Sequence, residues 1–308
     1  MKKLTPLAFA AIFLFGCCMP GGSAGPFDLV PASATSVATL SPSSVLNDPD
    51  FAYFYAKANS NRSINDEFAA ITAATGVQMR NVTLAVLFST GTGADRKSAA
   101  FLQGGFDASA TEQRLRSDPS WSATDYAGYS VFRKSGENNA IAFIDGSLLV
   151  GAPSAVQSAI DVKKGTAQNI RSNAELMGIL NKLNTSAELV YASESTGALP
   201  SELTSSPLNA SFFSGVRASG LDISKRLETI DVNAVLLTDN SVEAGKLQGS
   251  LTTFATLATT VFAQPVGSLA GLIAKIHISS EGEYVLISLQ TSVDELKAAE
   301  TELNTPPA

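Results

Sequence analysis

The segment AIAFIDGSLLV, residues 140–150, carries the clearest structural signal in the chain. Two apolar runs flank the pair Asp145-Gly146. This pair predicts a tight two-residue hairpin turn, because both central residues of such a turn need positive φ, which Asp and Gly tolerate. Ser154, with Gln157 three residues further on, then indicates the start of a helix. The segment therefore predicts two antiparallel strands followed directly by a helix.

A similar arrangement recurs near the end of the chain. The turn pair Glu281-Gly282 leads into an apolar run at 284–287, and Ser292 with Glu295 indicates the last helix. In each half an earlier helix start is predicted, at Ser109 with Glu112 and at Asn240 with Glu243. We expect an α+β fold with two similar units, each an antiparallel sheet with helices packed on one face.

The remaining patterns fit between these signals. Strands are predicted near residues 37–40, 82–88, 99–106, 129–133, 188–192, 212–223 and 232–237, with helical segments within 50–75 and from Ser172, capped by Glu175. Leu176, Ile179, Leu180 and Leu183 form an apolar stripe on the second of these helices, and we expect them in the core.

One helix stands out by its lack of charge. Leu247, Leu251, Phe254, Leu257 and Val261 follow helical spacing, and no charged residue occurs from 247 to 274. A membrane-spanning helix is one interpretation, but Gln264-Pro265 and several Thr, Ser and Gly residues interrupt the stretch. We expect a buried amphipathic helix followed by a loop.

The composition excludes several classes of function. The chain has 308 residues with 21 Lys+Arg and 28 Asp+Glu, a net charge of −7, which disfavours binding to nucleic acid. The histidine at 277 is the single one, and the two cysteines are adjacent at 17 and 18. We therefore expect no internal disulfide in the body, no zinc site and no cofactor.

The N-terminus predicts export. Lys2 and Lys3 precede an apolar run from 7 to 15, which has the length of a signal peptide rather than of a spanning helix. The run ends in Leu14-Phe15-Gly16-Cys17, which resembles the lipobox of bacterial lipoproteins. Phe15 departs from the small or β-branched residue common at that position in the family. An ordinary signal peptide or N-terminal anchor with incidental cysteines is the alternative interpretation.

The lipobox resemblance implies a lipid anchor. Signal peptidase II would cleave between Gly16 and Cys17, and Cys17 would carry the acyl chains. Because Cys18 rather than Asp follows, the resemblance favours the outer membrane, facing the periplasm. The body also looks like duplicated α+β envelope lipoproteins of unknown function. We expect a lipoprotein signal peptide at 1–16, a flexible tether at 17–26, α+β units at 27–184 and 185–303, and a disordered tail at 304–308.

No catalytic set emerges from the sequence. Gly21-Gly22-Ser23-Ala24-Gly25 has the letters of a serine-hydrolase motif, but it lies in the tether without the strand and helix that the motif needs. His277 is predicted to lie exposed in a strand. Asp48 and Asp50 lack the Gly and Glu of a calcium loop, and Asp48 more naturally begins a helix. We expect no enzyme and no metal site.

Two functions remain. The first is a membrane-anchored cell-envelope lipoprotein whose non-catalytic body docks on, or scaffolds, another envelope component. Its partners would be the membrane, through the lipid on Cys17, and an envelope protein. The alternative is a carrier of an apolar ligand or lipid between sheet and helices, motivated by the low charge and the Leu- and Phe-rich helix at 247–261.

Overall fold

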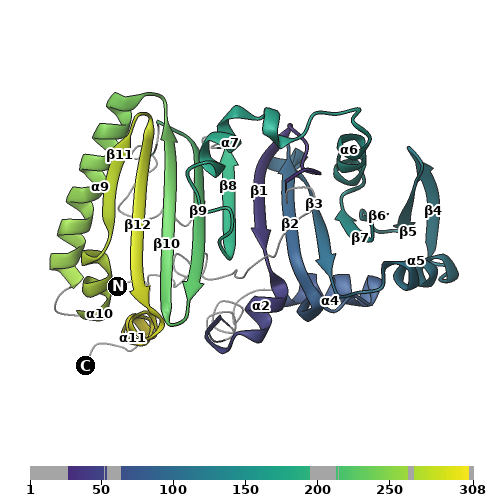
Figure 1. Ribbon diagram of the computed structural model, residues 1–308, viewed down its shortest axis with the longest axis horizontal. Coiled ribbons are helices and arrows are strands. Elements are labelled where there is room, and N and C mark those ends of the chain that lie inside the picture. Colours follow the sequence, from purple (N-terminus) through teal and green to yellow (C-terminus); the bar gives the residue numbers. More distant parts are fainter. Residues whose placement is uncertain are drawn as a thin grey trace. The chain divides into compact units, whose positions relative to one another are not determined.

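The computed structural model describes residues 27–51, 53, 64–194, 213, 215–262 and 267–304. These residues form two compact units, one that ends at Gly178 and one that begins at Ile179 (Figure 1). The predicted leader, cleavage site and tether lie outside the described residues, as do residues 305–308 of the predicted tail. Each unit is an antiparallel sheet with helices packed against it, so the α+β fold is confirmed.

The first unit holds seven strands in the order β1-β2-β3-β7-β6-β5-β4. The strands are β1 Ala34–Leu40, β2 Val82–Thr90, β3 Lys97–Gly104, β4 Trp121–Tyr126, β5 Tyr129–Lys134, β6 Ala140–Ile144 and β7 Ser147–Gly151. The helices are α2 Pro42–Asn47, α4 Ile64–Thr75, α5 Ala108–Ser117 and α6 Pro153–Lys164, with short 3₁₀ turns at Met79–Asn81, Gly93–Asp95 and Ile170–Ser172. The boundary between the units falls within the next helix, α7 Ala174–Leu180.

The second unit holds five strands in the order β8-β9-β10-β12-β11. The strands are β8 Leu189–Glu194, β9 Val216–Arg226, β10 Thr229–Thr238, β11 His277–Glu281 and β12 Tyr284–Ser292. The helices are α9 Ser241–Phe262, α10 Gly267–Ala274 and α11 Val293–Asn304.

The two sheets share one plan. Three consecutive antiparallel strands come first, β1-β2-β3 in one unit and β8-β9-β10 in the other. A helical connection follows, and a hairpin then returns so that its second strand pairs antiparallel with the third strand of the unit. The first unit adds the hairpin β4-β5 within that connection. The recurrence predicted from helix and turn spacing is therefore present in the strand order.

The hairpin turn predicted at Asp145-Gly146 is present in the structure. Asp145 and Gly146 have φ of 50° and 79°, and they join β6 to β7 with Ile144 paired to Ser147. A second turn of the same kind, Ala127-Gly128 with φ of 51° and 83°, joins β4 to β5. The sequence does not indicate β4, because most of its residues are exposed and it lacks an alternating apolar pattern.

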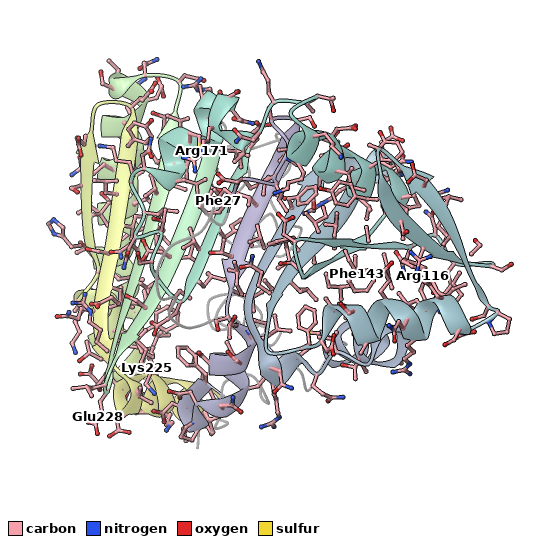
Figure 2. All side chains as sticks on the ribbon, turned by 45° about the vertical axis from the view of Figure 1, so that its right-hand side comes forward. Phe27, Arg116, Phe143, Arg171, Lys225 and Glu228 are labelled. Atoms are coloured by element: carbon pink, nitrogen blue, oxygen red, sulfur yellow. The ribbon has the colours of Figure 1, made fainter. Side chains whose placement is uncertain are left out.

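Helices cover both faces of the first sheet rather than one. Arg116 of α5 lies 5.2 Å from the ring centre of Phe132 on β5. That ring packs edge-on against Phe143, at 6.2 Å between centroids (Figure 2 labels Arg116 and Phe143). Lys164 of α6 lies 4.9 Å from the ring of Tyr129, also on β5. Tyr129 and Phe132 are three residues apart in β5, so their side chains point to opposite faces of the sheet. The helices α5 and α6 therefore pack on opposite faces of the first sheet.

Two predicted helix caps are present in the second unit. The side-chain oxygen of Asn240 accepts hydrogen bonds from the backbone N–H groups of Val242 and Glu243, at 3.0 and 3.1 Å. At α11, Ser292 Oγ accepts from the Glu295 N–H, and the Glu295 carboxylate accepts from the Ser292 N–H. This reciprocal arrangement satisfies donors that a helix start leaves unpaired.

Three predicted caps in the first unit are wrong by one or two residues. Asp107, not Ser109, accepts the N–H of Ala110 at the start of α5. Asn173, not Ser172, accepts the N–H of Leu176 at the start of α7. At α6 no side chain caps the helix, and Pro153 occupies the first turn instead. In each case a competing start signal lies beside the predicted one.

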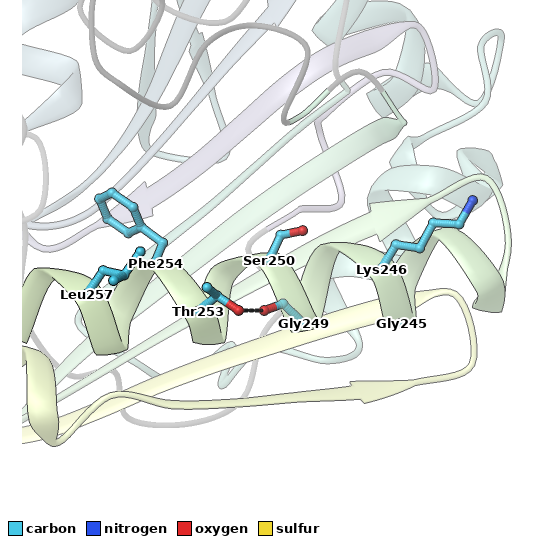
Figure 3. Close-up of a pocket in the computed structure, with 7 residues that line it drawn as sticks. All are labelled: Gly245, Lys246, Gly249, Ser250, Thr253, Phe254 and Leu257. Carbon is cyan, nitrogen blue, oxygen red and sulfur yellow. Dashed lines mark hydrogen bonds between the residues drawn. The ribbon is translucent and has the colours of Figure 1, made fainter.

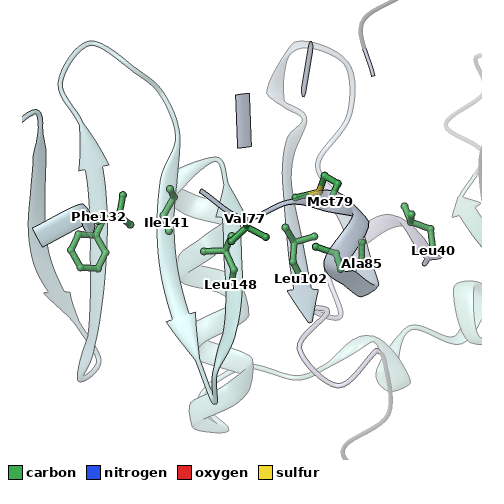
Figure 4. Packing of buried hydrophobic residues seen from close by; sticks show 10 residues of the cluster. Leu40, Val77, Met79, Ala85, Leu102, Phe132, Ile141 and Leu148 are labelled. Atoms are coloured by element: carbon green, nitrogen blue, oxygen red, sulfur yellow. The ribbon is translucent and has the colours of Figure 1, made fainter. Parts of the chain in front are cut away.

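The core of the first unit draws on both ends of its sequence. Ten buried residues pack together from the strands, α5 and the segment before β2 (Figure 4); they are Leu40, Val77, Met79, Val82, Ala85, Leu102, Leu115, Phe132, Ile141 and Leu148. The predicted stripe Leu176, Ile179, Leu180 and Leu183, which continues past Gly178 into the second unit, is also buried, as predicted.

Candidate docking surface

The predicted site at Gly16 and Cys17 lies outside the described residues, as does the hydrolase-like run Gly21 to Gly25. His277 is exposed at the start of β11, which is an edge strand of its sheet. The Asp48 carboxylate accepts the backbone N–H groups of Asp50 and Phe51, at 2.8 and 3.1 Å, and so begins a helix as predicted. Among the described residues no cluster of three or more His, Cys, Asp or Glu side chains could hold a metal ion.

A buried carboxylate ties two strands of the second unit, β9 and β10, to the segment that precedes β8. Asp222 on β9 is 1% exposed and accepts the backbone N–H of Asn184 and the side-chain amide of Asn233, both at 2.9 Å. Burial raises the pKa of Asp222 above the ordinary value of 3.8, while these hydrogen bonds oppose the shift. Both of its oxygens are engaged by protein groups, so its arrangement is structural.

The helix α9 offers a different kind of surface. Its inner side is conventional: Ala244 and Leu247 are buried and pack with Val285 of β12, and Leu251 lies partly buried against them. The structure corrects the prediction that the whole apolar stripe is buried. Phe254, Leu257 and Val261 are 39%, 59% and 66% exposed.

Helical geometry explains the difference. At 3.6 residues per turn, the apolar positions from Leu247 to Val261 spread over roughly 120° of the helix surface. The sheet covers only one edge of this arc, so the side chains at the other edge face outward. The alternative prediction of a carrier that holds an apolar ligand between sheet and helices was based on these same residues. Their outward position makes them part of the molecular surface instead.

The outer side of α9 carries very little polarity. No charged residue occurs between Leu247 and Phe262, although about a quarter to a third of a typical surface is charged. Five threonine hydroxyls on α9 donate back to the carbonyl four residues earlier, as for Thr253 to Gly249 at 2.9 Å; the others are Thr252, Thr256, Thr259 and Thr260. Because these donors are satisfied within the helix, the threonine methyl groups contribute to the exposed surface.

An open groove of about 540 Å³ lies on this side of α9 (Figure 3). It is lined by Gly245, Lys246, Gly249, Ser250, Thr253, Phe254 and Leu257. Among the described residues, a Cβ atom built at Gly245 or Gly249 would meet no atom within 4 Å, so packing against those residues requires neither glycine. We call the exposed residues of α9 from Gly245 to Val261 the α9 outer face.

Sequence reasoning did not single out Gly245 and Gly249. The available signal was their spacing of four residues at the start of a helix that carries no charge after Lys246, a pattern that allows close approach of a second helix.

The described residues thus form an α+β protein of two antiparallel units, and its helix α9 exposes apolar side chains within the uncharged stretch 247–262. No family model matches the sequence, and no curated protein matches it. Among solved structures, crystal forms III, IV and I of TP0453 resemble it in fold. In that order, the sequence identities are 12, 12 and 13%, and the TM-scores are 0.47, 0.48 and 0.48. The matches cover 91, 91 and 92% of this chain and 98, 97 and 99% of the TP0453 chain.

At this level of identity the likeness concerns the fold alone. Across the residues that the structure describes, no helix combines the length and hydropathy needed to cross a membrane.

Proposed function

We propose that this chain is a cell-envelope lipoprotein, anchored through Cys17 in the outer membrane and facing the periplasm, whose non-catalytic body docks on another envelope component. The anchor is supported by the lipobox-like run Leu14 to Cys17. The docking role is supported by one observation above all, the exposed apolar side chains of the α9 outer face, on which Lys246 is the single charged residue.

The anchor follows from lipid energetics. Each acyl CH₂ group contributes about 0.8 kcal/mol on burial, and a single chain binds only reversibly. Three chains on Cys17 would hold the protein in the bilayer. Residues 17–26 then span at most about 35 Å when extended, which keeps the body next to the membrane.

The docking role follows from burial of apolar surface. Full burial of a Phe, Leu or Val side chain contributes about 1.5–3 kcal/mol. Scaled by the exposed fractions of Phe254, Leu257 and Val261, covering the α9 outer face would contribute about 2.5–5 kcal/mol. A patch of this kind on a surface helix is typical of an interaction site.

Metabolic labelling tests the anchor. With radioactive or clickable palmitate, Cys17→Ala should lose the label, and the adjacent change Cys18→Ala should keep it. Labelling that survives Cys17→Ala, or a native chain recovered unlabelled in the aqueous fraction, contradicts lipid attachment at Cys17.

Complex size after gentle solubilisation tests the docking role. Wild-type protein should migrate in native gels above the mass of one chain, and the pair of changes Leu257→Ser and Val261→Ser should weaken that assembly roughly 100-fold. Leu227→Ser is the matched control, because Leu227 is 93% exposed but lies in the turn between β9 and β10. Equal migration of all three proteins argues against docking through α9.

A further inference from the structure

Gly245 and Gly249 occupy exposed positions inside a long helix, where glycine is the least favourable residue apart from proline. Neither has the positive φ that would require glycine, and the space beside both is open. Packing within the described part of the chain therefore gives no reason for these two glycines. Glycine at such a position does allow a second backbone to come close.

The α9 outer face is also complementary to itself. Gly245, Gly249, Thr253, Leu257 and Val261 follow one another at intervals of four residues and form a single ridge line on the helix. The first half of this line is hollow and the second half carries two protruding side chains. Gly249 and Leu257 lie at equal distances from Thr253, as do Gly245 and Val261.

We propose that the α9 outer face is covered by the same face of a second copy of this chain, packed about a two-fold axis at Thr253. This inference rests on the docking role proposed above and names the partner. A two-fold axis at that point brings Leu257 of each copy over Gly249 of the other, so both hollows are filled at once. Insertion of such ridge lines into each other is the commonest mode of helix packing.

Charge favours a second copy over a bare lipid surface. Helices that lie in a membrane interface carry many Lys or Arg residues, whereas α9 has only Lys246, which is paired with Glu243 at 2.8 Å. The net charge of −7 also opposes contact with anionic lipid. Two acidic copies can meet through α9, because the residues from 247 to 262 carry no charge.

The small area of the contact predicts that this dimer forms between membrane-anchored copies and only weakly between copies free in solution. A helix of 22 residues is about 33 Å long, so a contact strip about 10 Å wide along its whole length would bury roughly 700 Å² over both copies, and helices that cross at an angle bury less. This lies below the 1,200 Å² or more of stable complexes in solution, so the free body should associate weakly. Anchoring in one membrane raises the effective concentration of the copies and favours the pair.

Disulfide trapping in native membranes tests the geometry. In a chain with Cys18→Ser, lipidation of Cys17 leaves an introduced cysteine as the single free thiol. Thr253→Cys, on the axis, should form a covalent dimer under mild oxidation at least 10-fold faster than Thr252→Cys, its exposed neighbour about 100° around the helix. Adding Gly249→Leu should abolish the Thr253→Cys dimer by filling the hollow. Equal rates at 252 and 253, or no effect of Gly249→Leu, overturn the proposal.

Photocrosslinking separates this inference from the docking role. A photoreactive residue at position 257 of the anchored chain should yield an adduct of twice the chain mass, identified by mass spectrometry. An adduct only with a different protein overturns the second copy but keeps docking through α9. No adduct at all overturns both. Because only Leu257 is replaced and it is exposed, this measurement does not depend on the cysteine variants.

Discussion

Replacing Gly249 of α9 with Ala should stabilise the isolated protein. The added methyl group meets no atom within 4 Å, and Ala is favoured over Gly inside a helix by about 1 kcal/mol. Gly245→Ala has the same open surroundings, so the two changes together should add about 2 kcal/mol. For a body of this size each kcal/mol shifts the melting temperature by about 2–4 °C, which gives an expected rise of roughly 4–8 °C.

The measurement is thermal unfolding at micromolar concentration, followed by far-ultraviolet circular dichroism, with hydrogen exchange of the α9 amides to locate the effect. Gly220→Ala is the matched control in the same unit. A Cβ atom there would lie 2.3 Å from Ile179 Cγ2 and 2.8 Å from the carbonyl oxygen of Tyr191, so this change should destabilise by about 1–3 kcal/mol. Loss of stability in Gly249→Ala would show that glycine serves the fold of the chain itself, and would remove the reason for a close external contact.

Three further changes test the core and the electrostatics. Leu148→Ala should destabilise the first unit by about 2–5 kcal/mol in urea unfolding, because Leu148 is fully buried; a loss below 1 kcal/mol would contradict that packing. Burial raises the pKa of Asp222, so the folded chain loses stability as the pH rises above about 4. Urea unfolding midpoints measured from pH 4 to 7 should show this loss, and Asp222→Asn should reduce their dependence on pH. An unchanged pH dependence in Asp222→Asn would refute this effect of Asp222. Hydrogen bonds from Lys275, Thr291 and the helix start lower the pKa of Glu295 to about 2. The ionised Glu295 therefore stabilises the fold above pH 4.5, and this stabilisation is lost as the pH falls towards 2. Glu295→Gln should remove this acid sensitivity, and an acid unfolding transition that Glu295→Gln leaves unaltered would argue against this role of Glu295.

Local signals accounted for most of what the sequence could predict. The turn at Asp145-Gly146 and the cap at Asn240 depend on a few neighbouring residues, and both formed as predicted. The strand β4 escaped prediction because an exposed edge strand needs no apolar alternation. The helix α2, which begins at Pro42 directly after the strand predicted near 37–40, escaped prediction because it is only six residues long and has no side-chain cap at its start.

The candidate surface needed the structure. Periodicity showed that α9 has an apolar stripe, but it could not show which edge of the stripe the sheet covers. Leu247 faces inward and Leu257 outward, although both belong to the same pattern. The significance of Gly249 depends on the empty space beside it, and no sequence pattern reports that space.

The shared strand order identifies a point of insertion. The stretch between the third strand and the returning hairpin holds α9 and α10 in one unit and α5 with the β4-β5 hairpin in the other. The same strand pairing forms in both units although these connecting segments differ, so the strand order does not depend on what the connection contains. A reporter domain spliced into the Ala127-Gly128 turn would therefore extend the protein at a position where the fold already accommodates additional chain.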